Sequence, residues 1–160
     1  MPEITVTVNG TEHRLDVHDR LLLTDLLRDR LRLTGTHLGC EHGVCGACTV
    51  LLDDLPVRGC LVLAVQADGR QVRTVESVAP DASTLHPVQQ AMADCHGLQC
   101  GFCTPGIVMT LVAMHERDER PATDEVDEAL SGHLCRCTGY RNITEAAHRA
   151  LGCEREEARR

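Results

Sequence analysis

The sequence predicts an α+β protein, with a small mixed sheet in its first half and a bundle of short helices in its second half. Three observations carry this prediction. Apolar and polar residues alternate near the N-terminus, which is typical of a half-buried strand. Leucines recur at helical spacing within residues 21–33, and every periodic segment after residue 83 is helical. The segment Ala79-Pro80-Asp81-Ala82-Ser83 breaks all periodicity and is the expected linker, so we place domains at residues 1–78 and 79–160.

The first half opens on a predicted hairpin. Ile4–Val8 alternates apolar and polar residues, Asn9-Gly10 is a strong turn signal, and the return strand is expected at His13–Val17. The leucine spacing places one helix within Leu21–Leu33. Further strands are expected at Thr49–Leu52, Pro56–Arg58, Leu61–Val65 and Val72–Val75. This order of elements gives a small mixed sheet with one helix across it.

Four helices are expected in the second half, because prolines and capping residues mark the first turn of each. Their expected ranges are Pro87 to about Cys95, Gly106 to about Glu116, Thr123 to Leu130, and Asn142 to Ala150. Four short helices around a shared set of cysteines form a bundle. The charged tail Glu154–Arg160 is expected to fray.

The composition limits how such domains hold together. The chain has one Phe, one Tyr and no Trp, so both cores must be aliphatic. Two small aliphatic cores are marginal alone, and a bound metal adds folding free energy to domains of this kind. A net charge of −8 without a basic stripe argues against binding of nucleic acid.

Whether the ten cysteines form disulfides or metal sites depends on the cellular compartment in which the protein is expected. The N-terminal residues lack a basic segment followed by an apolar run, so no secretory signal is expected. The longest apolar stretch, Ile107–Met114, is too short to span a membrane. We therefore expect a cytoplasmic protein, and in a reducing cytoplasm cysteine clusters are typical of metal sites rather than disulfides.

Four cysteines of the first half have the spacing of a plant-type [2Fe–2S] loop. Cys40, Cys45 and Cys48 follow the pattern C-x4-C-x2-C, and Cys60 comes after eleven further residues. Glycines at positions 39, 43 and 46 let the loop curl tightly through positive φ angles. The amide groups of a curled loop can point at negatively charged sulfurs. The four cysteines are the predicted ligands of a first cluster.

A second set of four cysteines lies in the helical half. Cys100 and Cys103 form a C-x2-C pair just before a helix, and Cys135 and Cys137 form a C-x-C pair. Four thiolates suit either zinc or an iron–sulfur cluster, and structural zinc ribbons favour two C-x2-C pairs. Beside a plant-type loop in the same chain, the set favours a second cluster, because two clusters give electrons a route.

These motifs together resemble the iron–sulfur subunit of the molybdenum hydroxylases, the family of xanthine dehydrogenase, aldehyde oxidoreductase and aerobic carbon monoxide dehydrogenase. The resemblance covers residues 4 to about 151. It rests on Gly35-Thr36-His37 before Gly39-Cys40, on Cys45-Gly46-Ala47-Cys48-Thr49-Val50, on Gln99-Cys100-Gly101-Phe102-Cys103-Thr104-Pro105-Gly106, and on Leu134-Cys135-Arg136-Cys137-Thr138-Gly139-Tyr140. The gap between Cys48 and Cys60 resembles the bacterial branch with separate subunits.

The resemblance implies a fold and a set of partners. The first domain would be a β-grasp ferredoxin domain holding the [2Fe–2S] cluster distal to molybdenum, and the second a four-helix bundle holding the proximal one. A large partner subunit would carry molybdopterin and a medium one FAD, in a dimer of heterotrimers. This subunit of an oxidoreductase would pass electrons from molybdopterin through both clusters to FAD. By the same resemblance, Gln99 and Cys137 lie close to the pterin.

Two other functions are weighed against this one. A freestanding two-cluster ferredoxin would be a carrier without partner subunits, and a zinc-stabilised interaction module would have no redox activity. No nucleotide-binding loop or nucleophile–base pair is present, so no catalytic residue is expected on this chain. Carbon monoxide, aldehydes, N-heterocycles and acyl-CoA thioesters are all substrates in the family. The loop Glu41-His42-Gly43-Val44 differs from the Asp-Thr-Ser type of carbon monoxide dehydrogenases, which disfavours that gas.

Two cysteines remain once two sets of four are assigned. Cys95 is interpreted as a small buried thiol on a helix face, and Cys153 as a free thiol. His37 and His42 flank the first set, and a Rieske-type site uses two histidines. Because four cysteines already stand at the right spacing, neither histidine is an expected ligand.

Overall fold

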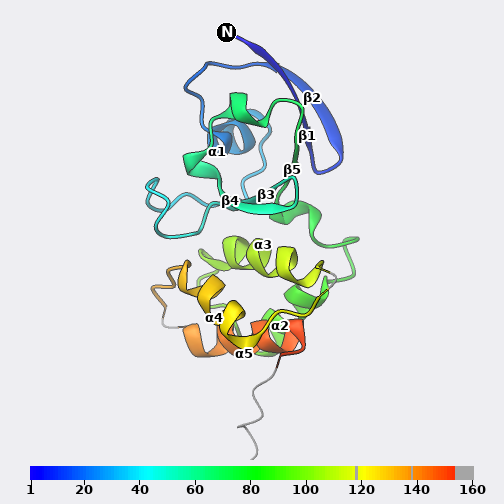
Figure 1. Ribbon diagram of the computed structural model, residues 1–160, viewed down its shortest axis with the longest axis vertical. Helices are drawn as coiled ribbons and strands as arrows, with labels where there is room; N and C mark the ends of the chain where they lie inside the picture. Colours follow the sequence, from blue (N-terminus) through cyan, green and yellow to red (C-terminus); the bar gives the residue numbers. More distant parts are fainter. Residues whose placement is uncertain (118, 138, 154–160) are drawn as a thin grey trace, which may run out of the picture.

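The computed structural model describes residues 1–117, 119–137 and 139–153, and it is an α+β structure (Figure 1). A five-stranded sheet, of order β2-β1-β5-β3-β4, lies above a group of helices. The strands are β1 Glu3–Val8, β2 Thr11–Asp16, β3 Thr49–Leu52, β4 Leu55–Arg58 and β5 Gln71–Arg73. The predicted tail Glu154–Arg160 lies outside the described residues.

The sheet is mixed, as the sequence predicts. Strand β1 pairs antiparallel with β2 and parallel with β5, whereas β3 pairs antiparallel with both β4 and β5. The hairpin between β1 and β2 turns through Asn9 (φ 51°) and Gly10 (φ 80°). Two positive φ angles in a two-residue turn match the right-handed twist of the flanking strands. The predicted Asn-Gly hairpin is therefore confirmed.

One predicted element of the first half is wrong in type. The helix predicted within Leu21–Leu33 is formed, as α1 Leu23–Asp25 continued by a π-helix, Leu26–Arg30. The predicted strand Leu61–Val65 is not formed; short 3₁₀ turns at Gly59–Leu61 and Ala64–Ala67 replace it. The main chain there bonds to the start of α1 instead of the sheet, since Leu23 N donates to Val62 O (2.8 Å) and Ala64 N to Leu21 O (2.7 Å).

The described residues of the second half form four α-helices, as predicted. They are α2 Pro87–Asp94, α3 Thr104–His115, α4 Thr123–Ser131 and α5 Tyr140–Leu151. Residues 106–114 of α3 are all buried, and Figure 1 shows this helix lying between the sheet and the other three. The last helix begins at Tyr140, two residues before the predicted cap at Asn142. Among the described residues, no helix has the length and apolar character needed to cross a membrane.

Strand β3 separates two aliphatic cores, because its side chains alternate between them. Val50 and Leu52 belong to the core between the sheet and α1. Leu51 belongs to the core built on α3 and the other helices. All three side chains are at most 3% exposed, so β3 is covered on both faces. The two halves of the chain therefore share one strand in their packing.

An ion pair adds to this packing. Arg73 at the end of β5 donates from Nη1 to Glu116 Oε2 (2.6 Å) and from Nη2 to Glu116 Oε1 (2.9 Å), just beyond α3. The side chains are 29% and 39% exposed, so solvent weakens the attraction. The hydrogen bonds from Arg73 hold the pKa of Glu116 below its ordinary value.

We expect Glu116→Gln to lower the free energy of unfolding by about 0.5–1 kcal/mol at pH 7. Because the pKa of Glu116 is depressed in the folded state, the contribution is complete above the unfolded pKa of about 4.3 and is lost as pH falls through the folded value. Denaturant unfolding of both proteins at pH 7 and pH 3.5 measures this difference. A double-mutant cycle with Arg73→Gln is the control, and zero coupling energy at pH 7 contradicts the pairing.

Candidate metal centres

The first cysteine set, Cys40, Cys45, Cys48 and Cys60, is brought together by a loop and a turn at one end of the sheet. The loop leaves the segment after α1 and runs into β3, and it curls through Glu41, Gly43 and Gly46, with φ angles of 54°, 77° and 78°. Cys60 arrives on the 3₁₀ turn Gly59–Leu61 directly after β4. Cys48 and Cys60 are buried, whereas Cys40 and Cys45 are half-buried.

Gly39 serves the loop differently from the prediction, because it does not adopt a positive φ angle. A Cβ atom at this position would lie 3.1 Å from Cys45 Sγ and 3.3 Å from Phe102 Cε1. The requirement is therefore space rather than backbone conformation. Glycine here lets the ring of Phe102, which belongs to the helical half, approach the first loop.

Backbone amides of the loop point at sulfur, as the sequence predicts. The amide groups of Cys45 and His42 donate to Cys40 Sγ at 3.3 and 3.4 Å. These hydrogen bonds, that of Cys45 first, lower the pKa of Cys40 to about 6. Burial instead raises the pKa of Cys48 to about 11. A thiolate at Cys48 therefore needs a cation beside it, and an iron ion supplies one.

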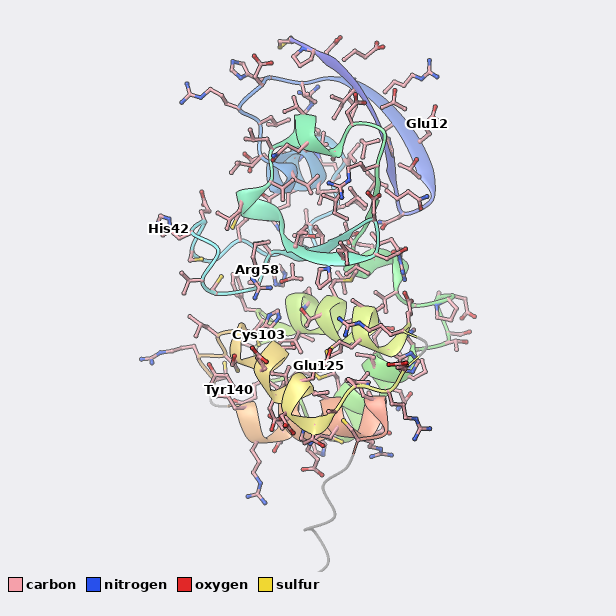
Figure 2. The ribbon with its side chains drawn as sticks, in the orientation of Figure 1. Glu12, His42, Arg58, Cys103, Glu125 and Tyr140 are labelled. Carbon is pink, nitrogen blue, oxygen red and sulfur yellow. The ribbon has the colours of Figure 1, made fainter. Side chains whose placement is uncertain are left out.

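The second cysteine set, Cys100, Cys103, Cys135 and Cys137, lies where α3 begins and where α4 gives way to α5. Phe102 N donates to Cys100 Sγ (3.5 Å), and Cys135 N donates to the hydroxyl of Tyr140 (2.8 Å). Burial raises the pKa of Cys103 to about 12. Figure 2 shows Cys103 and Tyr140 on the side of the molecule on which His42 marks the first loop.

Within each set the thiols lie two by two. Cys40 interacts with Cys45, and Cys48 with Cys60. In the second set the pairs are Cys100 with Cys137 and Cys103 with Cys135. Across the described ranges, no three His, Cys, Asp or Glu side chains gather as a single metal ion would require. Two ligands for each of two irons is the arrangement of a four-cysteine [2Fe–2S] cluster, so the donor set fits that group.

The two ligand loops touch each other directly. Leu134 N, one residue before Cys135, donates to the carbonyl oxygen of Cys45 at 2.9 Å. A Cβ atom at Gly46 would lie 2.5 Å from His133 Nδ1 and 2.7 Å from Gly132 O, so only glycine fits there. One hydrogen bond therefore connects a predicted ligand of the first cluster with the neighbour of a predicted ligand of the second.

Buried His133 packs beside the contact between the two ligand loops. Its Nε2 lies 2.8 Å from Thr110 Oγ1 on α3, and its side chain is 2% exposed. Burial, together with the charge of Arg58, lowers the pKa of His133 to about 4, so the ring is neutral at pH 7. A neutral imidazole fills the space between the loops without adding a charge.

One contact of this region, between His37 and Phe102, is missed by the sequence analysis. His37 stacks on Phe102, with ring centroids 4.9 Å apart, and its Nδ1 lies 2.8 Å from the Phe102 carbonyl oxygen. The sequence does place His37 beside the first set, but it carries no signal for a partner far along the chain. His42 is exposed on the loop. Gln99 is exposed beside Cys100, and its proximity to a pterin stays a prediction.

Comparisons with known proteins agree with this chemistry. Two family models match: the 2Fe-2S iron-sulfur cluster binding domain over residues 6–74 and the [2Fe-2S] binding domain over residues 74–148. The chain is 55% identical to 6-hydroxypseudooxynicotine dehydrogenase complex subunit beta of Paenarthrobacter nicotinovorans, over 94% of each chain. It is 56% identical to caffeine dehydrogenase subunit gamma of Pseudomonas sp. (strain CBB1), over 89% of this chain and 87% of that protein.

Chains of solved oxidoreductase structures are also similar to this chain in sequence and in fold. A chain of quinoline 2-oxidoreductase from Pseudomonas putida 86 is 43% identical, with a TM-score of 0.86 over 94% of each chain. Aldehyde oxidoreductase from Desulfovibrio gigas is 39% identical with a TM-score of 0.88, and the match covers 95% of this chain but 17% of that one. The chain belongs to the iron–sulfur subunits of the molybdenum hydroxylase family. As such a subunit it has binding domains for two [2Fe–2S] clusters.

The two remaining cysteines of this iron–sulfur subunit stand apart from both sets. Cys95 is half-buried at the C-terminal cap of α2, rather than fully buried on a helix face, and its Sγ lies 3.9 Å from Arg149 Nη1. Cys153 is also half-buried, and its Sγ lies 3.8 Å from His148 O. We expect Cys95→Ala to leave about four irons per chain, measured by metal analysis after anaerobic purification. A fall to about two irons would show that the ligand assignment is wrong.

Proposed function

We propose that this chain is the electron-transfer subunit of a molybdenum hydroxylase, which passes electrons from molybdopterin in a large partner subunit to FAD in a medium one. The observation that carries the proposal is the hydrogen bond from Leu134 N to Cys45 O, which joins the two cysteine sets. Bound [2Fe–2S] clusters supply one-electron redox chemistry. The polypeptide contributes their placement and the electrostatics around them.

The proposal assigns a role to each part of the chain. Residues 1–78 would form a β-grasp ferredoxin domain, with Cys40, Cys45, Cys48 and Cys60 as ligands of the distal cluster. Residues 79–160 would form a four-helix bundle, with Cys100, Cys103, Cys135 and Cys137 as ligands of the proximal cluster. The thiol pairs described above and the sharing of β3 between two cores support this division.

The exposed side of the second set is the proposed contact with the large subunit. Gln99 is exposed and Cys137 half-buried, and the neighbouring Phe102, Leu134 and Tyr140 are 46%, 54% and 46% exposed. Apolar side chains exposed around a redox site favour coverage by another protein. We place Gln99 and Cys137 next to the pterin, in a dimer of heterotrimers in the cytoplasm.

The names of several relatives support a proposal for the substrate class of the complex. 6-Hydroxypseudooxynicotine, caffeine, nicotine and quinoline, which occur in the names of relatives, all contain a nitrogen heterocycle. We therefore propose an N-heterocycle as the substrate of the complex, oxidised on the large subunit. This chain contributes no group to that step.

Purification of a tagged chain, expressed with its neighbouring genes, tests the proposal against a freestanding ferredoxin. The expected result is co-elution with a molybdenum-containing chain and a flavin-containing chain, and reduction of the clusters by an N-heterocyclic substrate. A chain that elutes alone at its own mass, with both clusters present, would favour the freestanding carrier and contradict the proposed function.

A further inference from the structure

Arg58, the last residue of β4, lies where the sheet meets the helices (Figure 2). It is half-buried and stands opposite Thr49 in the register of β3 and β4. Its Nη1 donates to Thr49 Oγ1, and its Nη2 donates to Gly132 O at 2.6 Å. The two acceptors lie in different halves of the chain. A single guanidinium thus holds one atom from each half.

Each acceptor is directly connected to a cysteine set. Thr49 follows Cys48, and its hydroxyl donates in turn to Gly46 O at 2.7 Å. Gly132 is three residues before Cys135, and Leu134 between them donates to Cys45 O. Arg58 therefore lies beside the contact between the two ligand loops and bonds to both of its sides.

We propose that Arg58 is a positioning residue that fixes the separation of the two clusters and favours residence of the transferred electron on the first one. The inference rests on the proposed function, because it presumes two clusters in one chain. Nothing in it requires Arg58 to touch a cluster, a substrate or a cofactor.

The geometry of the guanidinium explains the first part of the proposal. Its planar group has several N–H donors in a fixed fork, whereas a lysine ammonium is a point charge on a flexible stem. Only the fork can bond to the hydroxyl on β3 and the carbonyl beyond α4 at the same time. Loss of either bond releases the first loop from the second at this point.

The position of the charge explains the second part. Arg58 is two residues before Cys60 in the chain, and it bonds to the hydroxyl of Thr49, the residue after Cys48, so it is linked to two predicted ligands of the first cluster. Its bond to the second half is to the Gly132 carbonyl, three residues before Cys135, the first predicted ligand beyond it. A fixed cation stabilises added negative charge more strongly at the nearer site, and partial burial limits screening. The electron added on reduction is therefore favoured at the first cluster.

The test uses Arg58→Gln, Arg58→Lys and Arg70→Gln in the purified, cluster-loaded protein. Arg70→Gln is the matched control, because it removes one positive charge from the same half, where Arg70 pairs with exposed Asp53 at 2.6 Å. EPR of fully reduced protein measures spin–spin interaction between the clusters, which depends on their separation. EPR during redox titration measures how one electron is shared between them.

Arg58→Gln is expected to weaken the spin–spin interaction and to shift the sharing of the electron about tenfold toward the second cluster, equal to about 59 mV for a one-electron couple. Arg58→Lys is expected to retain the sharing but still weaken the interaction, and it carries the test if Arg58→Gln fails to fold. Arg70→Gln is expected to change neither.

Two outcomes overturn the inference. One is an unchanged spin–spin interaction in both Arg58 variants, and the other is an equal redistribution of the electron in Arg58→Gln and Arg70→Gln. Either result, in a wild-type protein that shows two cluster signals, leaves the proposed function intact. A wild-type protein without two such signals would instead contradict the proposed function itself.

Discussion

Cys48→Ser is expected to reduce the iron content from about four to about two atoms per chain and to remove one of two [2Fe–2S] EPR signals. Cys48 is 2% exposed and lies in thiol contact with Cys60. A serine hydroxyl is a much poorer ligand for this iron than a thiolate. In the assembled enzyme, substrate should still reduce the molybdenum and the remaining cluster, whereas reduction of the flavin should be lost.

The matched control for this variant is Cys95→Ser, which makes the same chemical change outside both cysteine sets. It should retain both EPR signals and full flavin reduction. Rapid-mixing absorption spectra of the complex, with substrate as the only reductant, separate reduction of the clusters from reduction of the flavin. Full turnover in Cys48→Ser, with one cluster signal missing, would contradict a route through both clusters.

Gly46→Ala is expected to lower the free energy of unfolding by about 2–5 kcal/mol and to disturb both cluster signals together. The left-handed conformation of Gly46 (φ 78°) costs a substituted residue about 1–2 kcal/mol. The added methyl group would also meet His133 and Gly132, and such overpacking costs about 1–3 kcal/mol. Relief of the clash must move the second ligand loop away from the first.

Gly69→Ala is the matched control, because Gly69 has a similar φ of 70° but open space around its missing side chain. It should cost only the conformational part, about 1–2 kcal/mol. Denaturant unfolding and EPR of both variants make the comparison. Equal destabilisation by the two substitutions, with unchanged EPR spectra, would show that the close contact at Gly46 is unimportant.

The cysteine sets could be predicted from the sequence because cluster ligation constrains spacing locally. Three of the four residues in the first set lie within one loop, and the curl through Gly43 and Gly46 is encoded beside them. The hairpin at Asn9-Gly10 and the proline-led helices α2 and α3 were equally local signals, and the structure confirms them. In each case neighbouring residues carry the physical reason for the conformation.

The errors arise where the local structure is determined by contacts between residues that are far apart in the sequence. Leu61–Val65 has the composition of a strand, but its main-chain groups form hydrogen bonds with the start of α1 instead of with the sheet. Cys60, just before this segment, lies on a 3₁₀ turn that brings it back toward Cys48. The bond from Arg58 to Gly132 spans 74 positions, and that from His37 to Phe102 spans 65. Periodicity and spacing contain no information about such pairs, which is why the junction of the two loops required the structure.

EPR spectroscopy with iron and zinc analysis, on one anaerobically purified and dithionite-reduced sample, tests the central claim most directly. The account predicts two distinct [2Fe–2S] signals and about four irons per chain, with each signal removed by substitution within one cysteine set only. A sample that contains zinc, or a single cluster signal that needs cysteines from both sets, would contradict it.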